Sequence, residues 1–275
     1  MGRMLDRLPF TIDRGPPTGT QRPAGVRRWV GGRLRALADR LFGALAGRRL
    51  LAPVRAEPAR WSRFPPNQPA WMRLVREIAL TALVFPIMRL LYRVDVVGRE
   101  RLAALDGPVV IAANHCLHLD NPLILMALPS QLRRTTAIAA ADDSIFASWR
   151  GRWAALFGNA FPISRSRASR RSLARIEAVL ANGYSVLIYP EGRLTVGGPM
   201  GPFKLGVGFI AAETGTPVVP LYLDVRRVGP AEGRFWPPRG DVRIHVGDLL
   251  VCSRDESPSV ATARLEAAVR GLSPR

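Results

Sequence analysis

The sequence is poor in several residue types, and each shortage excludes a class of protein. Its 275 residues include two cysteines, Cys116 and Cys252, which excludes a disulfide-stapled scaffold and a zinc site built from four cysteines. With three histidines, a histidine-rich metal centre is also disfavoured. Aromatic residues make up 7% of the chain and are not interleaved with the basic stretches, as a stacking platform for single-stranded nucleic acid would require.

Long apolar runs are missing as well. The best candidate, residues 78–88, contains Pro86 and is flanked by charged residues, so it is too short to span a bilayer and suits an interface or a core. The first 25 residues lack the apolar stretch and the small-residue cleavage site of a secretory signal. We therefore expect neither a transmembrane helix nor a secretory leader.

Positive charge is what the chain has in excess. Lysine plus arginine number 40 against 21 acidic residues, a formal net charge of +19, and Lys204 is the one lysine. Residues 1–64 alone hold 14 arginines and 4 acidic residues. The planar guanidinium group of arginine binds phosphate and carboxylate groups. This charge therefore indicates an anionic partner, which at this point could be nucleic acid, a membrane surface or an acidic substrate.

The N-terminal quarter of the chain has its own organisation. Residues 26–51 place leucines at helical spacing among arginines, which predicts a basic amphipathic helix. Such a helix can lie on an anionic membrane, or it can dock on its own domain. Residues 65–69, a proline-rich stretch, read as a linker before a second helix at about 71–92.

From Val94 onward, short apolar runs alternate with helical patterns. Strands are expected at 108–113, 136–140, 161–165, 185–189, 217–223 and 241–246, and helices at 122–128, 169–181, 203–214 and 257–272. This alternation predicts an α/β fold with a mostly parallel, twisted sheet flanked by helices, preceded by the basic N-terminal helical region. Chemistry in such sheets usually lies at strand ends, in loops that lead into helices.

One such loop carries a candidate general base. The strand at 108–113 runs directly into a loop that holds His115 and Asp120, with Asp120 or Asn121 as the expected cap of the next helix. On a regular helix these two residues would lie about 140° apart, but in a strand-to-helix turn the carboxylate can fold back onto the imidazole. A carboxylate on one ring nitrogen fixes the tautomer and makes the other nitrogen a better base for a hydroxyl proton.

Three further strand ends complete a pattern. They are Phe161-Pro162-Ile163-Ser164-Arg165, the run from Leu187 through Pro190-Glu191-Gly192-Arg193, and Val218-Val219-Pro220-Leu221. In this order and spacing, the four segments resemble the motif blocks of the glycerolipid acyltransferase family, the lysophosphatidate-acyltransferase-like enzymes. The resemblance covers about residues 95–250 and includes Phe203-Lys204-Leu205-Gly206 and Pro238-Arg239-Gly240.

The resemblance implies a role for each matching residue. His115 would be the general base that activates the acceptor hydroxyl, and Asp120 the carboxylate that orients it. Arg165 and Arg193 would bind the acceptor's phosphate, while Glu191 and Gly192 would shape that pocket. The family transfers the acyl group directly, with neither a covalent acyl-enzyme nor a metal or other cofactor. Its acyl donor is acyl-CoA or acyl-carrier protein.

The same resemblance also implies a domain organisation, a set of partners and a cellular location. Residues 1–70 would be a basic, partly disordered region with the amphipathic helix, and residues 71–275 the acyltransferase domain. Within that domain we expect a leading apolar helix at 71–93, the motif-bearing core at 94–250 and a C-terminal helix at 257–272. The implied partners are the acyl donor, a lysophospholipid and an anionic membrane surface, on the cytoplasmic side of the cell membrane, with the protein peripheral or monotopic.

The third block departs from the family's usual E-G-T-R-S, because Arg193 follows Gly192 directly. The departure leaves the acceptor open: lysophosphatidate, glycerol 3-phosphate, lysophosphatidylethanolamine or a lyso-aminolipid. Cys116 and His118 fill variable positions of the first block. We expect Cys116 to pack as a small apolar side chain, His118 to act as a cap or surface residue, and His245 to be structural. The alternative function is a catalytically inactive basic protein that binds membranes or nucleic acid.

Overall fold

The structure, a computed structural model, describes residues 70–141, 158–164, 170–227 and 240–274. All of these belong to one compact unit, Pro58–Arg275. The expected amphipathic helix at 26–51, the rest of the N-terminal region, the linker at 65–69 and Arg165 lie outside the described residues.

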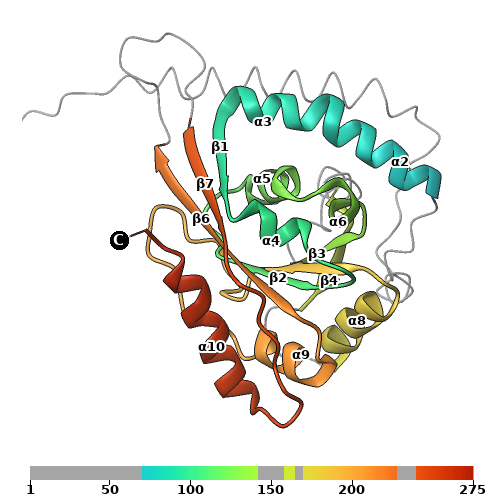
Figure 1. Ribbon diagram of the computed structural model, residues 1–275, viewed down its shortest axis with the longest axis vertical. Helices are drawn as coiled ribbons and strands as arrows, with labels where there is room; N and C mark the ends of the chain where they lie inside the picture. Colours follow the sequence, from blue (N-terminus) through green and yellow to red (C-terminus); the bar gives the residue numbers. More distant parts are fainter. Residues whose placement is uncertain (1–69, 142–157, 165–169, 228–239, 275) are drawn as a thin grey trace, which may run out of the picture. The chain divides into compact units, whose positions relative to one another are not determined.

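A seven-stranded sheet forms the centre of the unit (Figure 1). Its spatial order is β1-β7-β6-β2-β5-β3-β4. The strands are β1 (Tyr92–Val97), β2 (Val110–Ala113), β3 (Thr136–Ala141), β4 (Ala160–Ile163), β5 (Ser185–Ile188), β6 (Val218–Arg227) and β7 (Gly240–Val246). Every neighbouring pair is parallel except β6 and β7. The mostly parallel α/β sheet expected from the sequence is therefore confirmed.

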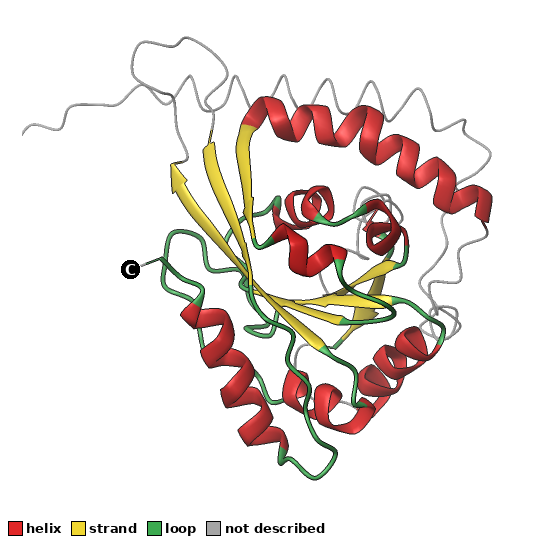
Figure 2. Ribbon diagram, in the orientation of Figure 1, coloured by secondary structure: helices red, strands yellow, loops and turns green. Residues whose placement is uncertain are grey.

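Helices cover both faces of this sheet (Figure 2). One face packs against α3 (Phe85–Leu91), α4 (Arg99–Ala103), α5 (Asp120–Ala127) and α6 (Ser130–Arg134), and the other against α8 (Arg170–Ala181), α9 (Gly206–Thr214) and α10 (Pro258–Gly271). Strand β2 packs against both helix layers. Ile111 and Ala113 belong to the hydrophobic core on the α3–α6 side, and Val110 and Ala112 to the core on the α8–α10 side. A strand buried on both faces needs a continuous apolar run, which is what this segment has.

The expected helix at 71–92 is present, but with a wide turn in its middle. It runs as α2 (Ala70–Ala79), a π-helical turn η2 (Leu80–Val84) and α3. In the wide turn, the backbone N–H of Phe85 reaches back to the carbonyl of Leu80. Pro86 follows at once and has no N–H to continue the α-helical ladder, which accounts for the interruption at this point.

The buried side of α2 is charged and its outer side is apolar. Glu77 and Arg133 form an ion pair with side chains 8% and 9% exposed. Arg133 also donates to the carbonyl oxygen of Leu128 at 3.0 Å, and Arg76 donates to the carbonyl oxygen of Arg133 at 3.2 Å. Burial lowers the pKa of the Arg76 guanidinium to about 10. This polar cluster fixes α2 against α6.

Several details differ from the expectations; the helices α4 and α6, for example, were not expected. Strand β1 was not expected, because the exposed Arg93 and Asp95 alternate with its half-buried residues and break the apolar run. Helix α5 begins at Asp120 with Leu119 as its cap, so Asp120 and Asn121 lie inside the helix. Helix α9 begins at Gly206 rather than at residue 203, where the chain is still tied by other hydrogen bonds: the N–H of Lys204 donates to Pro190, and that of Phe203 to Glu266.

The Glu77–Arg133 pair gives a stability prediction. Glu77→Gln leaves the Arg133 guanidinium buried without its counter-charge, so we expect the free energy of unfolding to fall by about 3–5 kcal/mol. Asp248→Asn is the matched control, because the Arg101–Asp248 pair is exposed and the substitution should cost at most about 1 kcal/mol. Urea unfolding measures both values. Equal losses for the two variants would contradict a structural role for the buried pair.

Candidate active site

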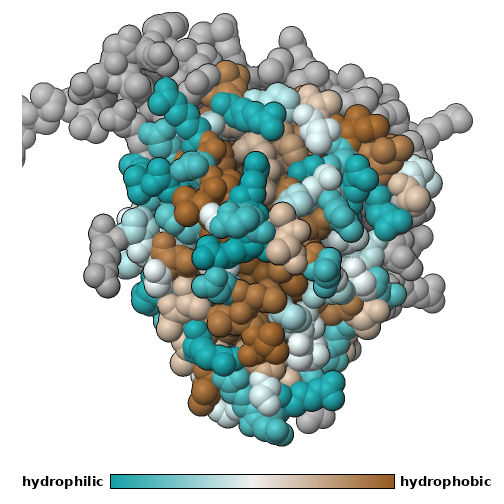
Figure 3. Space-filling model, in the orientation of Figure 1, coloured by the Kyte–Doolittle hydropathy of each residue, from teal (hydrophilic) through white to brown (hydrophobic). Residues whose placement is uncertain are grey.

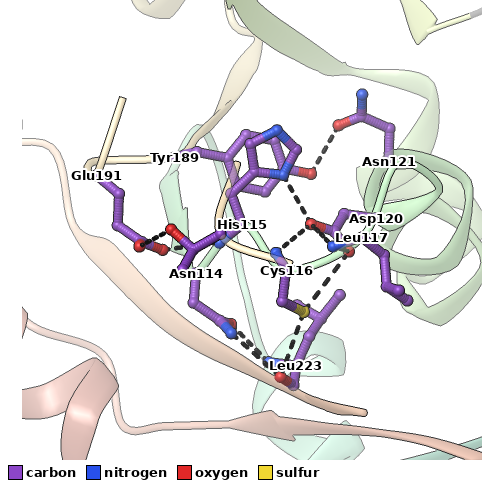
Figure 4. Close-up of polar contacts among 10 residues, drawn as sticks. Asn114, His115, Cys116, Leu117, Asp120, Asn121, Tyr189, Glu191 and Leu223 are labelled. Atoms are coloured by element: carbon purple, nitrogen blue, oxygen red, sulfur yellow. Dashed lines mark hydrogen bonds and ion pairs between the residues drawn. The ribbon is translucent and has the colours of Figure 1, made fainter. Parts of the chain in front are cut away.

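The candidate site lies where the central strand β2 ends. The chain leaves β2 at Ala113, runs through residues 114–119 and enters α5 at Asp120. Strand β5 lies parallel beside β2, so the turn that follows β5, residues 189–193, meets the 114–119 loop at the same edge of the sheet. Strands and loops that are far apart in sequence therefore supply one small cluster of polar groups (Figure 4).

His115 and Asp120 form the predicted pair. Nδ1 of His115 lies 2.7 Å from Oδ2 of Asp120. The aspartate side chain is fully buried, whereas the imidazole is 21% exposed. The fold-back geometry proposed from the sequence is therefore present in the structure.

Backbone amides hold the Asp120 carboxylate in place. Oδ2 accepts the N–H of Cys116 at 2.9 Å, and Oδ1 accepts the N–H of Leu117 at 3.0 Å. Both oxygens of the side chain therefore act as acceptors. The carboxylate then requires a proton on Nδ1 of His115, which leaves Nε2 on the opposite edge of the ring with a free lone pair. Figure 4 shows this nitrogen directed away from Asp120.

Glu191 binds the backbone of the histidine loop. Its Oε1 accepts the N–H of His115 at 2.9 Å, and its Oε2 accepts the N–H of Gly201 at 2.7 Å and the hydroxyl of Thr195 at 3.3 Å. The N–H of Thr195 in turn donates to the carbonyl oxygen of His115 at 2.8 Å. Glu191 is 4% exposed, so its carboxylate spans two loops and fixes the position from which the imidazole projects.

Gly192 and Arg193 follow in the same turn. Gly192 has φ +67°, a backbone conformation that favours glycine. A Cβ there would lie 2.7 Å from Cε and Nζ of Lys204, so the Lys204 side chain occupies the space that a larger residue would need. Arg193 is exposed, and its guanidinium runs beside Gly201, where an added Cβ would lie 3.3 Å from Nη2. The Arg193 guanidinium and the Glu191 carboxylate thus both lie beside Gly201.

Two residues of the cluster were missed at the sequence level. Asn114 is buried and pairs with the backbone of Leu223, donating from Nδ2 at 3.1 Å and accepting at Oδ1 at 2.7 Å. Tyr189 stacks on His115 with ring centroids 4.2 Å apart. The only sequence signal for either was a polar or aromatic residue directly after a buried strand.

Comparisons with known proteins cover the same part of the chain. The Acyltransferase family matches residues 93–224, the stretch that contains His115, Asp120 and the turn after β5. These residues make up just under half of the chain, and their match supports a glycerolipid acyltransferase family. Within the described residues, no group of three or more histidine, cysteine, aspartate or glutamate side chains could hold a metal ion.

Two curated relatives carry the name 1-acyl-sn-glycerol-3-phosphate acyltransferase. The chloroplastic BAT2 protein of Brassica napus is 32% identical over 56% of this chain and 44% of its own length. The chloroplastic LPAT1 protein of Arabidopsis thaliana is 28% identical over 66% of this chain and 49% of its own length. The chain therefore spans about half the length of these relatives.

A solved structure shares the fold. The 1-acyl-sn-glycerophosphate acyltransferase PlsC of Thermotoga maritima superposes with a TM-score of 0.54 and 22% identity, covering 89% of this chain and 87% of the other. At that identity, the likeness concerns the arrangement of helices and strands. It agrees with the α/β architecture of the unit described above.

The surroundings of His118, His245 and Cys116 differ from those of His115. His118 is exposed, and His245 lies in β7, where burial lowers the pKa of its imidazole. Cys116 is half-buried, with Sγ 3.8 Å from Oδ1 of Asp120 and 3.7 Å from the carbonyl oxygen of Leu223. Burial and the neighbouring carboxylate raise the pKa of this thiol well above its usual range. A thiolate nucleophile at this position is therefore disfavoured.

The raised pKa of the Cys116 thiol predicts its reactivity. Only the thiolate is alkylated, and a raised pKa keeps the thiol protonated through neutral and mildly alkaline pH. We expect iodoacetamide labelling of Cys116, followed by peptide mapping, to stay far below that of an unstructured cysteine peptide at pH 8, and to approach it after unfolding in urea. Labelling of the folded protein at the peptide's rate would show an accessible thiolate and contradict this account.

Proposed function

We propose that this protein transfers a fatty acyl group from acyl-CoA or acyl-carrier protein to the free hydroxyl of a lysophosphatidate-like lysophospholipid. The match to the Acyltransferase family and the names of the curated relatives support this reaction class. The observation that carries the proposal is the 2.7 Å contact between His115 and a buried, amide-bound Asp120 at the end of the central strand. This pair supplies one basic nitrogen that is free to face a substrate.

The proposed reaction needs no covalent enzyme intermediate. Nε2 of His115 takes the proton of the acceptor hydroxyl while the hydroxyl oxygen attacks the thioester carbonyl carbon. A carbon–oxygen bond forms, the carbon–sulfur bond breaks, and the leaving thiolate takes the proton back from the imidazolium. Asp120 keeps Nδ1 protonated throughout and stabilises the positive charge on the ring. The products are the acylated lipid and a free thiol.

The acceptor's phosphate is proposed to bind at Arg193, with Arg165 as a second cation. An exposed guanidinium in the turn after β5, near Gly201, supports this proposal, because arginine binds phosphate through two parallel hydrogen bonds. Gly192 leaves room for the Lys204 side chain in the same turn. Glu191 supports the pocket through the backbone, since both of its carboxylate oxygens already accept hydrogen bonds from the two loops.

The proposed acceptor is an amphiphilic lipid and its acylated product has two acyl chains, so we further propose that the reaction takes place at the cytoplasmic membrane surface. Helix 70–91 exposes an apolar stripe, which consists of Trp71, Leu74, Val75, Ile78, Leu83, Ile87 and Leu90. The wide turn η2 adds a residue to one turn, which keeps Leu83 in line with Ile78. Figure 3 shows apolar side chains exposed over α2 at the upper right.

Such a stripe suits shallow insertion into an interface. Large exposed apolar patches mark protein or membrane contacts, and a helix that lies in the membrane plane buries its apolar face at the headgroup boundary. The arginine-rich N-terminal region would add attraction to anionic lipids. No helix within the described ranges is long and apolar enough to cross a bilayer.

The reaction is tested with purified protein, labelled acyl-CoA or acyl-carrier protein, and a panel of lysolipids read by mass spectrometry. We expect ester formation with lysophosphatidate, and His115→Ala should lower kcat by about 10²–10⁴-fold through loss of the general base. His118→Ala is the matched control and should keep wild-type turnover, because that imidazole is exposed and lies outside the pair. Near-normal turnover in His115→Ala would reject the mechanism.

Membrane attachment is tested by substituting residues of the apolar stripe. Leu74→Glu combined with Ile78→Glu should weaken co-sedimentation with vesicles of anionic phospholipid, because two charges would enter the headgroup boundary with the helix. The control is Val251→Glu combined with Val260→Glu, since these side chains are similarly exposed but lie on other elements. Equal binding of both variants and the wild type would exclude the stripe as a membrane contact.

A further inference from the structure

Tyr189 covers one face of the His115 imidazole. The two rings lie 4.2 Å apart between centroids, and their planes differ by 17°, which is a stacked arrangement (Figure 4). Tyr189 comes from the turn after β5, whereas His115 comes from the loop after β2. The contact therefore joins the two segments that build the site, and it involves the one side chain to which the proposed reaction assigns a proton transfer.

The tyrosine is itself held in place at its far end. Its hydroxyl donates to Oδ1 of Asn121 at 2.7 Å, and Asn121 is the residue after Asp120. Burial and the nearby Asp120 charge raise the pKa of the Tyr189 phenol well above its usual range, so this hydroxyl stays a donor. At its near end, the main chain of the turn is tied to the histidine loop through Glu191. The ring thus has little freedom to slide off the imidazole.

We propose that Tyr189 is a positioning residue for His115, which fixes the plane of the imidazole and stabilises the imidazolium formed during acyl transfer. The inference rests on the proposed function, because the imidazolium exists only if His115 acts as the base. Asn121 anchors the tyrosine, and Asp120 holds the edge of the same ring. The histidine is then restrained by one contact in its plane and one across its face.

Both contacts are needed for a physical reason. A single hydrogen bond at Nδ1 fixes the distance to Asp120 but lets the ring tilt about that bond, which would swing Nε2 away from the acceptor hydroxyl. A stacked ring removes the tilt. The electron-rich face of an aromatic ring also attracts a cation that lies within about 6 Å of its centroid, so the stack favours the charged form of the imidazole over the neutral form.

A substitution series separates the π face from simple packing. Tyr189→Phe keeps the ring and loses only the Asn121 contact, so kcat should stay within about threefold of wild type. Tyr189→Leu keeps an apolar side chain without a π face, and kcat should fall by about 5- to 30-fold while the acceptor KM changes little. Tyr222→Leu is the matched control; this tyrosine packs in the cluster on the other sheet face, and its loss should leave kcat unchanged.

A second measurement remains informative if Tyr189→Leu folds poorly. Phenylalanine analogues with one to five fluorine atoms at position 189 preserve the shape of the ring and progressively weaken its negative face. The proposal predicts that log kcat falls steadily with fluorination while the melting temperature stays nearly constant. Equal kcat across the fluorinated series, or a Tyr189→Leu variant as active as Tyr189→Phe, would overturn it.

These outcomes differ from a failure of the proposed reaction itself. If wild-type protein acylates no lysolipid with either donor, the proposed function fails and the series has no kcat to compare. If the wild type is active and His115→Ala is not, yet the fluorinated variants match phenylalanine, the function stands and the role of Tyr189 is wrong.

Discussion

The site depends on one buried carboxylate. Asp120 has no exposed side-chain surface, and it accepts hydrogen bonds from two backbone N–H groups of the 114–119 loop as well as from the imidazole of His115. An unpaired charge in that position would be costly, so the loop must close around it for the domain to fold. The same hydrogen bonds that stabilise the fold therefore set the tautomer and direction of the histidine. Folding and the proposed catalysis share one constraint.

The neighbouring turn extends this constraint across the sheet. Glu191 binds the N–H of His115, Thr195 binds its carbonyl oxygen, and Tyr189 covers its ring. These three residues lie on one segment, so a single turn fixes the main chain and the side chain of the proposed base. What stays exposed is Arg193, a long cationic side chain suited to an anionic substrate. The arrangement gives a rigid base beside an adaptable binding group, which is how preorganised sites are usually built.

Much of this could be predicted from local patterns, and the misses have physical causes. The buried runs at 108–113 and 185–189 predicted the two central strands, and the alternation of strands and helices predicted that the chemistry would lie at strand ends. The His115–Asp120 contact could be predicted because the residues are close in sequence. Tyr189 on His115 and Asn114 on Leu223 join residues far apart in the chain, which leave no periodic signal. The Glu77–Arg133 pair could not be predicted for a different reason. Charged residues on an amphipathic helix normally face solvent, whereas on this helix the apolar residues do.

The central claim is that Asp120 holds the neutral imidazole of His115 with its proton on Nδ1 and its lone pair on Nε2. Nitrogen NMR of protein labelled with ¹⁵N-histidine reads this directly, since the chain has three histidines and His115→Ala assigns the relevant signals. The account predicts a protonated Nδ1 and an unprotonated Nε2 for neutral His115, with that preference lost in Asp120→Asn. A neutral His115 with its proton on Nε2 would contradict it, because that nitrogen could not accept a proton from a lipid hydroxyl.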